Sequence, residues 1–341
     1  MIKRKAGLIH YRWFALSIFT VLLHAQSLRE NARMIDSLKE LPVGLGVLPP
    51  PAIPKDNPQN SKKIELGRRL FFDKQLSADN TISCASCHDP KHGFSDGLAR
   101  GVGFHGAQTL RHTPTVWNAA YSSSQFWDGR ATSLEEQVNG PMSSATEMNS
   151  PEKSSLAGRL DADAYYHRSF RTVFGEPPNQ ANVMKALAAY ERTLVARYSK
   201  FDRYARGDKN ALNLHEKNGL VLFIGKGRCA RCHKGPNFSD GKFQNIGEGN
   251  EDDSGRFSVT HEEADRGAFK TAGLRNVKLH PPYMHDGNLP TLEAVIDYYD
   301  RGGGARPGKS PFIMKIGLTA GEKRDLTAFL RALTDESSPR H

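Results

Sequence analysis

The strongest constraint on this chain is a short segment that occurs twice and holds all four of its cysteines. The first copy reads SCASCHDPKHGFSDG from Ser83, and the second reads RCARCHKGPNFSDG from Arg228. Each copy contains the pattern C-x-x-C-H, first as Cys84, Cys87 and His88 and then as Cys229, Cys232 and His233. A fold for this chain therefore has to build the same local structure twice.

The pattern C-x-x-C-H is typical of the covalent attachment of c-type haem. Two thiols at this spacing can bond both vinyl groups of one porphyrin, and the next residue then places an imidazole under the iron. A four-cysteine zinc site would need both pairs to converge and would give the histidines no role. Two disulfides, which suit an exported chain, also leave the histidines unexplained. We therefore predict two covalently bound haem c groups, with His88 and His233 as ligands.

The repeat continues after the cysteines. TPTVWNAAYSSSQFWDGRATSLEEQV begins at Thr113, and TAGLRNVKLHPPYMHDGNLPTLEAVI begins at Thr271. Aligned without a gap, the two share an Asn, an Asp-Gly pair and a Leu-Glu pair, which are Asn118 and Asn276, Asp128-Gly129 and Asp286-Gly287, and Leu134-Glu135 and Leu292-Glu293. Two shared segments in the same order predict a duplicated module.

Helix signals dominate the rest of the chain. SKKIELGRRLFFD predicts a short helix before the first cysteines, and capping boxes begin helices at Ser133 and Thr319. A long amphipathic helix is predicted from about Asn182 to Tyr198. Residues 40–60 are rich in Pro and Gly and predict an extended arm. No long alternating-strand pattern competes, so we predict a mainly α fold with two cytochrome c-like haem domains.

The break FGEPPNQ suggests a boundary between domains over 26–178 and 179–338. The first 25 residues combine basic residues with an apolar run from Trp13 to Leu23. That run is about half of the ~20 residues that a bilayer span needs, which favours a signal peptide over 1–25 and a periplasmic protein. An uncleaved anchor is the alternative. The formal charge of +10 is not gathered in a Lys/Arg-rich run with aromatics, so nucleic acid is not an expected partner.

Each iron also needs a sixth ligand or an open position, and spacing alone does not choose among the candidates. A Met ligand raises the reduction potential, whereas a Tyr oxygen stabilises the ferric and higher states. The first half offers His92, His105 and His112, and the second offers Met284, Met314, Tyr298, Tyr299, His261, His280 and His285.

The two halves differ where chemistry would need a difference. Gln137 and Glu147 in the first half align with Val295 and Ala305, so only the first half has an amide and a carboxylate there. A carboxylate beside an open iron site could move a proton between the two oxygens of a peroxide. The alternative is that Gln137 is a helix-surface residue and Glu147 a solvated loop charge.

These segments together resemble the bacterial di-haem cytochrome c peroxidase family, which includes the MauG-like enzymes, over residues 40–335. The signature stretches are LGRRLFFDKQLSADNTISCASCHDP, QFWDGRATSLEEQVNGPMSSATEM, CARCHKGPNFSD, LRNVKLHPPYMHDG and GLTAGEKRDLTAFLRALT. The resemblance implies a peroxidatic haem on His88, with Gln137 and Glu147 as the peroxide-site amide and acid–base carboxylate. It makes Trp127 the tryptophan between the haems.

For the second haem, the resemblance implies electron transfer and places the axial ligand at Tyr299, with Met314 and Met284 as alternatives. His105 lies near the position of a distal His that MauG-like members generally lack. The family also has a calcium ion between the domains, but His112 stands where one of its ligands is usually Asn, and Ala272 where Pro is more usual.

The function implied is reduction of hydrogen peroxide to water through a ferryl haem. The electrons would come from a small periplasmic cytochrome c or cupredoxin. One alternative is a MauG-like oxidase that modifies side chains of a partner protein, and the other is a non-enzymatic di-haem electron carrier. Many relatives are homodimers.

Overall fold

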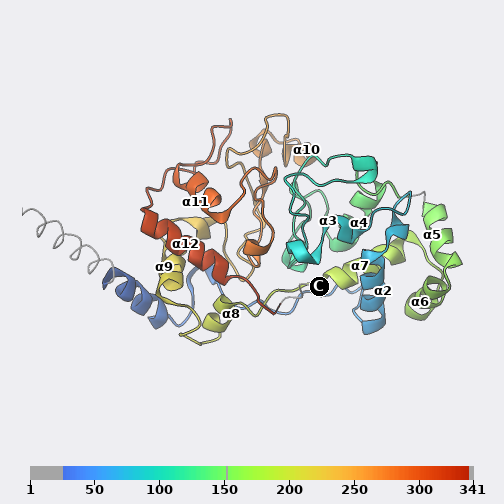
Figure 1. Cartoon of the computed structure of the whole chain (residues 1–341), viewed down its shortest axis with the longest axis horizontal. Helices are drawn as coiled ribbons and strands as arrows, with labels where there is room; N and C mark the ends of the chain where they lie inside the picture. The colour runs from blue at the N-terminus through green and yellow to red at the C-terminus, as the bar shows by residue number, and fades with distance from the viewer. Residues whose placement is uncertain (1–25, 151–152, 338–341) are drawn as a thin grey trace, which may run out of the picture.

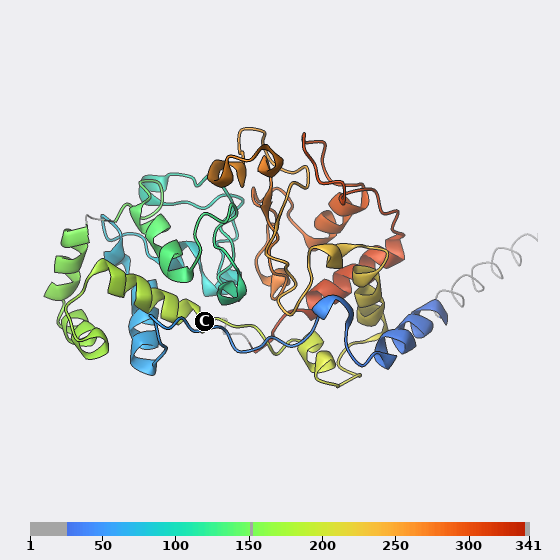
Figure 2. The ribbon, with the colours of Figure 1, turned by 180° about the vertical axis from the view of Figure 1, so that it is seen from behind.

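The computed structural model describes residues 26–150 and 153–337, and the predicted signal peptide over 1–25 lies outside them. Figures 1 and 2 show two helical lobes side by side, joined below by extended segments. Within the described residues, no helix has the length and apolarity that a membrane span requires. One two-stranded sheet is present in this part of the chain, in which β1 (Phe243–Gln244) pairs antiparallel with β2 (Phe269–Lys270). The prediction of a mainly α fold is confirmed.

The helix over residues 26–37 packs on the second lobe, and the later helices divide between the lobes in sequence order. The first lobe contains α2 (Ser61–Phe72), α3 (Cys84–Cys87), α4 (Leu134–Ser143), α5 (Lys153–Ala162), α6 (Ala164–Phe174) and α7 (Gln180–Glu191). The second contains α8 (Lys200–Ala205), α9 (Leu214–Ile224), α11 (Leu292–Asp300) and α12 (Ala320–Ala332). The short helix α10 (Phe257–Thr260) lies at the top, where the lobes meet.

Local signals placed most helix starts correctly. The predicted short helix is α2, and its first turn is capped by the Asn60 side chain, which accepts from the backbone N–H of Lys63. The capping box at Thr319 is confirmed, because both of its hydrogen bonds with Glu322 are present. At Ser133 half of the predicted box is present: its side chain caps α4, but the carboxylate of Glu136 accepts from Thr132 instead.

The helix predicted from Asn182 to Tyr198 is shorter than expected. It is α7, which ends at Glu191. The residues after it are drawn out of helical geometry by Asn118, whose backbone N–H donates to the Leu194 carbonyl at 2.9 Å. The Asn118 side chain then accepts from the Ala196 N–H at 2.8 Å. The apolar period continues through Leu194, but tertiary hydrogen bonds decide the backbone there.

Each lobe has its own apolar core, and α7 belongs to the first. That core runs from Leu66 to Ala196, whereas the second gathers residues from Phe201 to Leu333 and also Ile35 and Leu45 from the chain start. By packing, the division therefore falls after Ala196, later than the predicted boundary at 178. FGEPPNQ is the turn between α6 and α7 within one lobe. The arm over 40–60, extended as predicted, runs from the second lobe back to the first (Figure 2).

The two cores are built on similar helix crossings. In the first lobe α2 crosses α7 at Gly67, where an added Cβ would lie 1.8 Å from the Ala186 carbonyl oxygen. In the second lobe α9 crosses α12 at Gly219, where an added Cβ would lie 2.0 Å from the Asp325 carbonyl oxygen. Only glycine allows such close approach of the two backbones. Each crossing carries one of the C-x-x-C-H segments on its edge.

Candidate active site

The first cysteine segment presents a histidine prepared for metal binding. The backbone carbonyl of Phe94 lies 3.1 Å from Nδ1 of His88. A carbonyl only accepts, so Nδ1 carries the proton and the lone pair of Nε2 is left for an iron. Burial lowers the pKa of His88, which keeps the ring neutral.

The second segment repeats this arrangement. Nδ1 of His233 lies 3.0 Å from the Phe238 carbonyl, and burial again lowers the pKa of the imidazole. Phe94 and Phe238 both have left-handed backbone angles, with φ of 57° and 54°, so the two carbonyls are turned inward by the same local geometry.

The four cysteines themselves are not paired in disulfides. In the described part of the chain, no group of three or more His, Cys, Asp or Glu side chains is arranged to hold a metal ion. The two cysteine pairs therefore do not converge as a four-cysteine zinc site requires. The geometry fits two separate haem sites.

A cavity of about 310 Å³ adjoins the second segment and is lined by Cys229, Cys232 and His233. Its wall holds polar atoms that are buried and have no hydrogen-bond partner among the described residues, namely Arg228 Nη1, Asn237 Oδ1 and the Nε2 atoms of His112, His280 and His285. Buried polar atoms are seldom left unpaired. An unpaired arginine nitrogen at the wall of an otherwise apolar cavity fits a porphyrin, whose propionate groups are anionic.

The three axial ligands that the resemblance favours for the second haem, Tyr299, Met314 and Met284, all line this cavity. Tyr299 is on α11. Burial raises the pKa of its phenol, and the nearby thiols of Cys229 and Cys232 add to this rise, which places Tyr299 close to the second cysteine pair. Met314 also lines the cavity, but its side chain is 48% exposed. Met284 occupies the turn before the second Asp-Gly pair, with a φ of 73°.

The predicted acid–base carboxylate lies beside the first segment. Burial raises the pKa of the Cys87 thiol to about 11, and the negative charges of Asp96 and Glu147 add to this rise. Glu147 therefore lies within electrostatic range of the Cys87 thiol. Burial raises the pKa of Glu147 itself, and the guanidinium of Arg130 opposes the shift. Glu147 is thus a half-buried carboxyl and not a solvated loop charge.

Gln137 lies on α4 in the first lobe. Its side chain is half-buried, and its amide has no hydrogen-bond partner within the described ranges. The amide is therefore available to a ligand.

Of the three histidines considered as distal ligands of the first iron, His92 and His105 are on the surface, whereas His112 is buried. His105 is exposed in a tight turn, with its ring centroid 3.9 Å from that of Phe104. His92 is exposed and pairs with Asp89 at 3.2 Å. The turn of His105 does approach the site, because the Phe104 N–H donates to the Glu147 carbonyl at 2.8 Å.

Trp127 lies at the junction of the two lobes. Its indole N–H donates to the His112 carbonyl at 2.8 Å, and its ring centroid is 6.5 Å from that of His285. The backbones exchange two equivalent hydrogen bonds at this point: the His112 N–H donates to the His285 carbonyl, and the Lys270 N–H to the Trp127 carbonyl, both at 2.8 Å. In the repeat, His112 aligns with Lys270 and Trp127 with His285.

Sequence reasoning missed three charged groups near these sites. Arg111 bridges carboxylates of both lobes at the junction. Glu191 lies buried beside Cys84, and burial raises its pKa to about 8. Lys270 lines the cavity, and burial lowers its pKa to about 8. The only available signal was proximity to the repeated segments, which does not distinguish a buried charge from a solvated one.

The donors present at the junction do not favour the calcium ion that the family has between its domains. Calcium binds oxygen ligands. His112 supplies nitrogen, and its Nδ1 already lies 2.7 Å from the Leu98 carbonyl. The nearby carboxylates of Asp128 and Asp253 are paired with Arg111.

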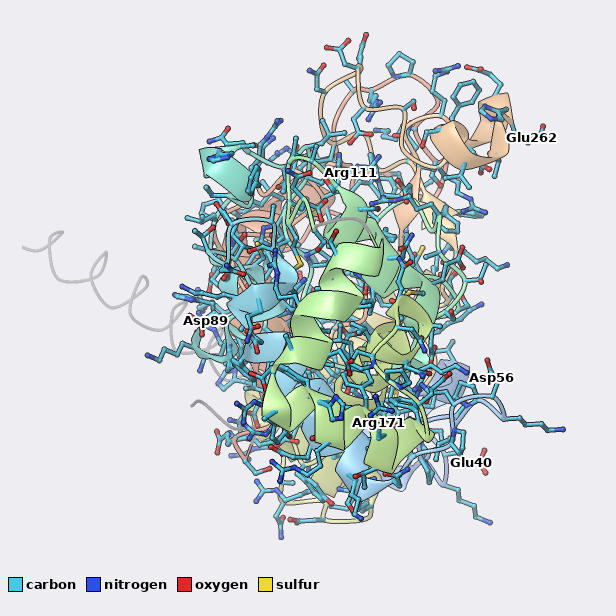
Figure 3. All side chains as sticks on the ribbon, turned by 90° about the vertical axis from the view of Figure 1, so that its right-hand side faces the viewer. Glu40, Asp56, Asp89, Arg111, Arg171 and Glu262 are labelled. Atoms are coloured by element: carbon cyan, nitrogen blue, oxygen red, sulfur yellow. The ribbon has the colours of Figure 1, made fainter. Side chains whose placement is uncertain are left out.

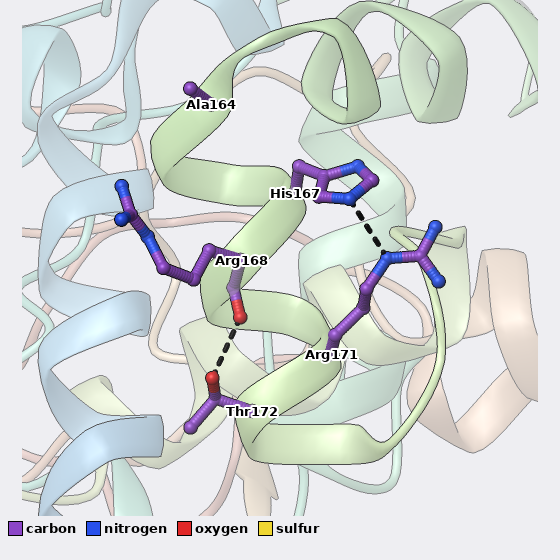
Figure 4. Close-up of a pocket in the computed structure, with 5 residues that line it drawn as sticks. All are labelled: Ala164, His167, Arg168, Arg171 and Thr172. Carbon is purple, nitrogen blue, oxygen red and sulfur yellow. Dashed lines mark hydrogen bonds between the residues drawn. The ribbon is translucent and has the colours of Figure 1, made fainter.

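A second hollow lies on the surface of α6 (Figure 4), a helix that Figure 1 shows at the outer end of the first lobe. It is lined by Ala164, His167, Arg168, Arg171 and Thr172, all of them exposed. Within the helix Arg171 donates to His167 at 3.1 Å, and Nδ1 of His167 lies 3.0 Å from Asp161 at the end of α5. It is an open surface depression with no part in the site above.

Comparison with known proteins agrees with this geometry. The family profile described as di-haem cytochrome c peroxidase matches residues 61–210. The methylamine utilization protein MauG of Methylorubrum extorquens is 44% identical over 83% of this chain and 81% of that protein. The cytochrome c551 peroxidase of Pseudomonas aeruginosa is 34% identical over 94% of this chain and 90% of that protein.

Among solved structures, a MauG-like protein associated with microbial copper homeostasis superposes with a TM-score of 0.82. It is 36% identical and covers 89% of this chain and 98% of that one. The chain belongs to the di-haem cytochrome c peroxidase family, as its sequence motifs predicted, and is an enzyme of that family.

Proposed function

We propose that this chain is a periplasmic di-haem peroxidase that reduces hydrogen peroxide to water at its first cysteine segment. A small cytochrome c or cupredoxin would supply the electrons through the second segment. The haems would be attached through Cys84 and Cys87 and through Cys229 and Cys232, with His88 and His233 as ligands. When bound, haem supplies the iron at which the O–O bond breaks and the redox equivalents for its reduction.

The observation that carries the proposal is the half-buried carboxyl of Glu147 beside Cys87. Its raised pKa suits a group that accepts a proton from one peroxide oxygen and returns it to the other. The unpaired amide of Gln137 can hold the bound peroxide by a hydrogen bond. Trp127, fixed between the lobes, is in position to connect the two sites.

For the second site we propose Tyr299 as the axial ligand. It is inside the cavity close to Cys229 and Cys232, whereas Met314 is half in solvent. Burial alone favours the protonated phenol of Tyr299. A bound iron cation would lower the pKa of this phenol, so Tyr299 would lose its proton on becoming a ligand.

A MauG-like oxidase that modifies side chains of a partner protein is the second candidate. Tyr299 favours it, as do the 44% identity to MauG and the 36% identity to a MauG-like protein. The non-enzymatic electron carrier is less consistent with a half-buried acid beside only one of the two segments.

We further propose that the two lobes arose by duplication of one module. The sequence suggested domains over 26–178 and 179–338, and the two hydrophobic cores move the proposed boundary to a point after Ala196. The paired helix crossings, the two His–carbonyl contacts and the reciprocal hydrogen bonds at the junction support the duplication. A signal peptide over 1–25 and a homodimer remain part of the proposal.

A stopped-flow reaction of the all-ferric holoprotein with hydrogen peroxide tests the function. We expect a direct reaction, followed by turnover when a reduced cytochrome c is added. A reaction without turnover of any small donor protein would favour the MauG-like alternative. No reaction in either the ferric or the half-reduced state would contradict both and leave the electron carrier.

A further inference from the structure

We infer that Arg111 is a positioning residue that joins the two lobes through carboxylates of both and thereby fixes Trp127 between the two sites. The structural part of this inference does not depend on the proposed function. Its consequence, communication between the haems, rests on that function.

Arg111 makes three charge-assisted hydrogen bonds across the junction. Nη1 donates to Asp128 of its own lobe at 2.7 Å. Nε and Nη2 donate in parallel to the two oxygens of Asp253 in the other lobe, at 2.8 and 2.7 Å. The three side chains are only 13%, 6% and 9% exposed, so water competes little for these contacts. Figure 3 labels Arg111 in the upper part of the molecule.

Both ends of this bridge lead to Trp127. Asp128 directly follows Trp127, and the carbonyls of Asp128 and Gly129 accept from Arg256 of the second lobe at 2.9 and 3.0 Å. On the other side of Arg111, the guanidinium lies 5.2 Å from the centroid of the Phe269 ring. Phe269 stacks on His285 at 3.5 Å.

The aromatic contacts therefore form a continuous series from Arg111 through Phe269 and His285 to Trp127. Because the indole N–H and the backbone carbonyl of Trp127 are also bonded, the residue is held from several directions at once. Among these contacts, only the bridge formed by Arg111 is an ionic one, in which one guanidinium pairs with a buried carboxylate of each lobe. Removing Arg111 would leave the buried carboxylate of Asp253 without its cation, whereas Asp128 would keep Arg130.

The same arrangement explains the misfit of calcium at this position. Arg111 pairs with both Asp128 and Asp253, and Arg130 also pairs with Asp128 at 2.9 Å, so side chains carry the positive charge between the lobes. We therefore expect the junction to stay closed when divalent cations are removed.

The test is hydrogen–deuterium exchange of the holoprotein in Asp253→Asn, Arg111→Gln and Arg111→Lys variants. The matched control is Glu293→Gln, which neutralises a carboxylate paired with Arg331 at the surface, where both side chains are about half exposed. The amides to follow are those of Lys270 and His112, which bond across the junction. We expect their protection to fall about tenfold or more in Asp253→Asn and Arg111→Gln, less in Arg111→Lys, and not in the control.

A second measurement tests whether a displacement of Trp127 weakens communication between the two haems. After one equivalent of peroxide, the loss of the ferric electron paramagnetic resonance signal of the second haem should be smaller in Asp253→Asn than in the wild type. Magnetic circular dichroism should show unchanged ligation in both. Wild-type protein that does not react with peroxide would contradict the proposed function, and the exchange result would still decide the inference.

Three outcomes would overturn the inference. One is unchanged exchange at Lys270 and His112 in Asp253→Asn. Another is a general rise in exchange that includes α2 and α9, which would report loss of the fold. The third is a rise in exchange when a chelator is added to the wild type, which would show that a divalent cation holds the junction.

Discussion

The replacement of Glu147 by Gln tests the proposed chemistry most directly. Gln has nearly the same shape, so Glu147→Gln removes a proton-transfer group without opening a cavity. A positioned general acid–base contributes about 10²- to 10⁴-fold to a rate. We expect the rate of the peroxide reaction to fall by that factor, which corresponds to about 3–5 kcal/mol in the activation free energy.

The burial of Glu147 also predicts the shape of the pH profile. Burial raises its pKa, so the carboxylate that accepts the proton becomes populated only at a higher pH than for an ordinary Glu. The wild-type rate should therefore rise with pH through that raised pKa. The Gln variant cannot titrate at this position and should lose this limb of the profile.

The assay is stopped-flow absorbance with excess peroxide, from about pH 4 to 8. Glu262→Gln is the matched control, because Glu262 is an exposed carboxylate far along the chain from the site (Figure 3). The thermal stability of Glu147→Gln should not fall, since the variant no longer buries a charge. A variant with the full rate and an unchanged pH profile would refute the reasoning and point to another acid–base group.

Three further predictions concern the second haem and the fold. Tyr299→Phe should change the near-infrared magnetic circular dichroism of the second haem; an unchanged spectrum would reassign the ligand to Met284 or Met314. Asp202→Asn should lower the free energy of unfolding by about 3–5 kcal/mol in denaturant titrations, because Asp202 pairs with Arg275 at 2.7 Å and both are almost fully buried. Gly67→Ala should lower the melting temperature by several degrees, since its Cβ would overlap the Ala186 carbonyl; equal melting temperatures would show that α2 and α7 move apart freely.

The sequence predicted those features that short segments determine by themselves. The starts of α2 and α12 follow from side chains that cap their own first turn, and each C-x-x-C-H segment builds its histidine contact within six residues. These interactions are complete within a local stretch, so the pattern of residue types is enough to predict them.

Features that depend on distant partners could not be predicted in the same way. The end of α7 is set by Asn118, which is 78 residues from Ala196 in the chain. The bridge from Arg111 to Asp253 spans 142 residues, and neither residue belongs to a recognisable motif. The predicted boundary at 178 followed a Pro-Gly turn, but a turn inside a lobe has the same composition as a linker between lobes.

The junction also shows how two similar halves can support different chemistry. The backbones of His112 and Lys270 make equivalent hydrogen bonds to the opposite lobe, so the main chain treats the halves alike. The side chains break this equivalence, because the aligned residues Trp127 and His285 differ in chemistry. Their rings contact each other, but Trp127 is an oxidisable indole, whereas His285 is an imidazole whose Nε2 is buried without a partner among the described residues. In the proposed function, a symmetric backbone therefore has unlike side chains at its centre, and the aromatic group proposed to connect the haems belongs to the half that also carries Glu147.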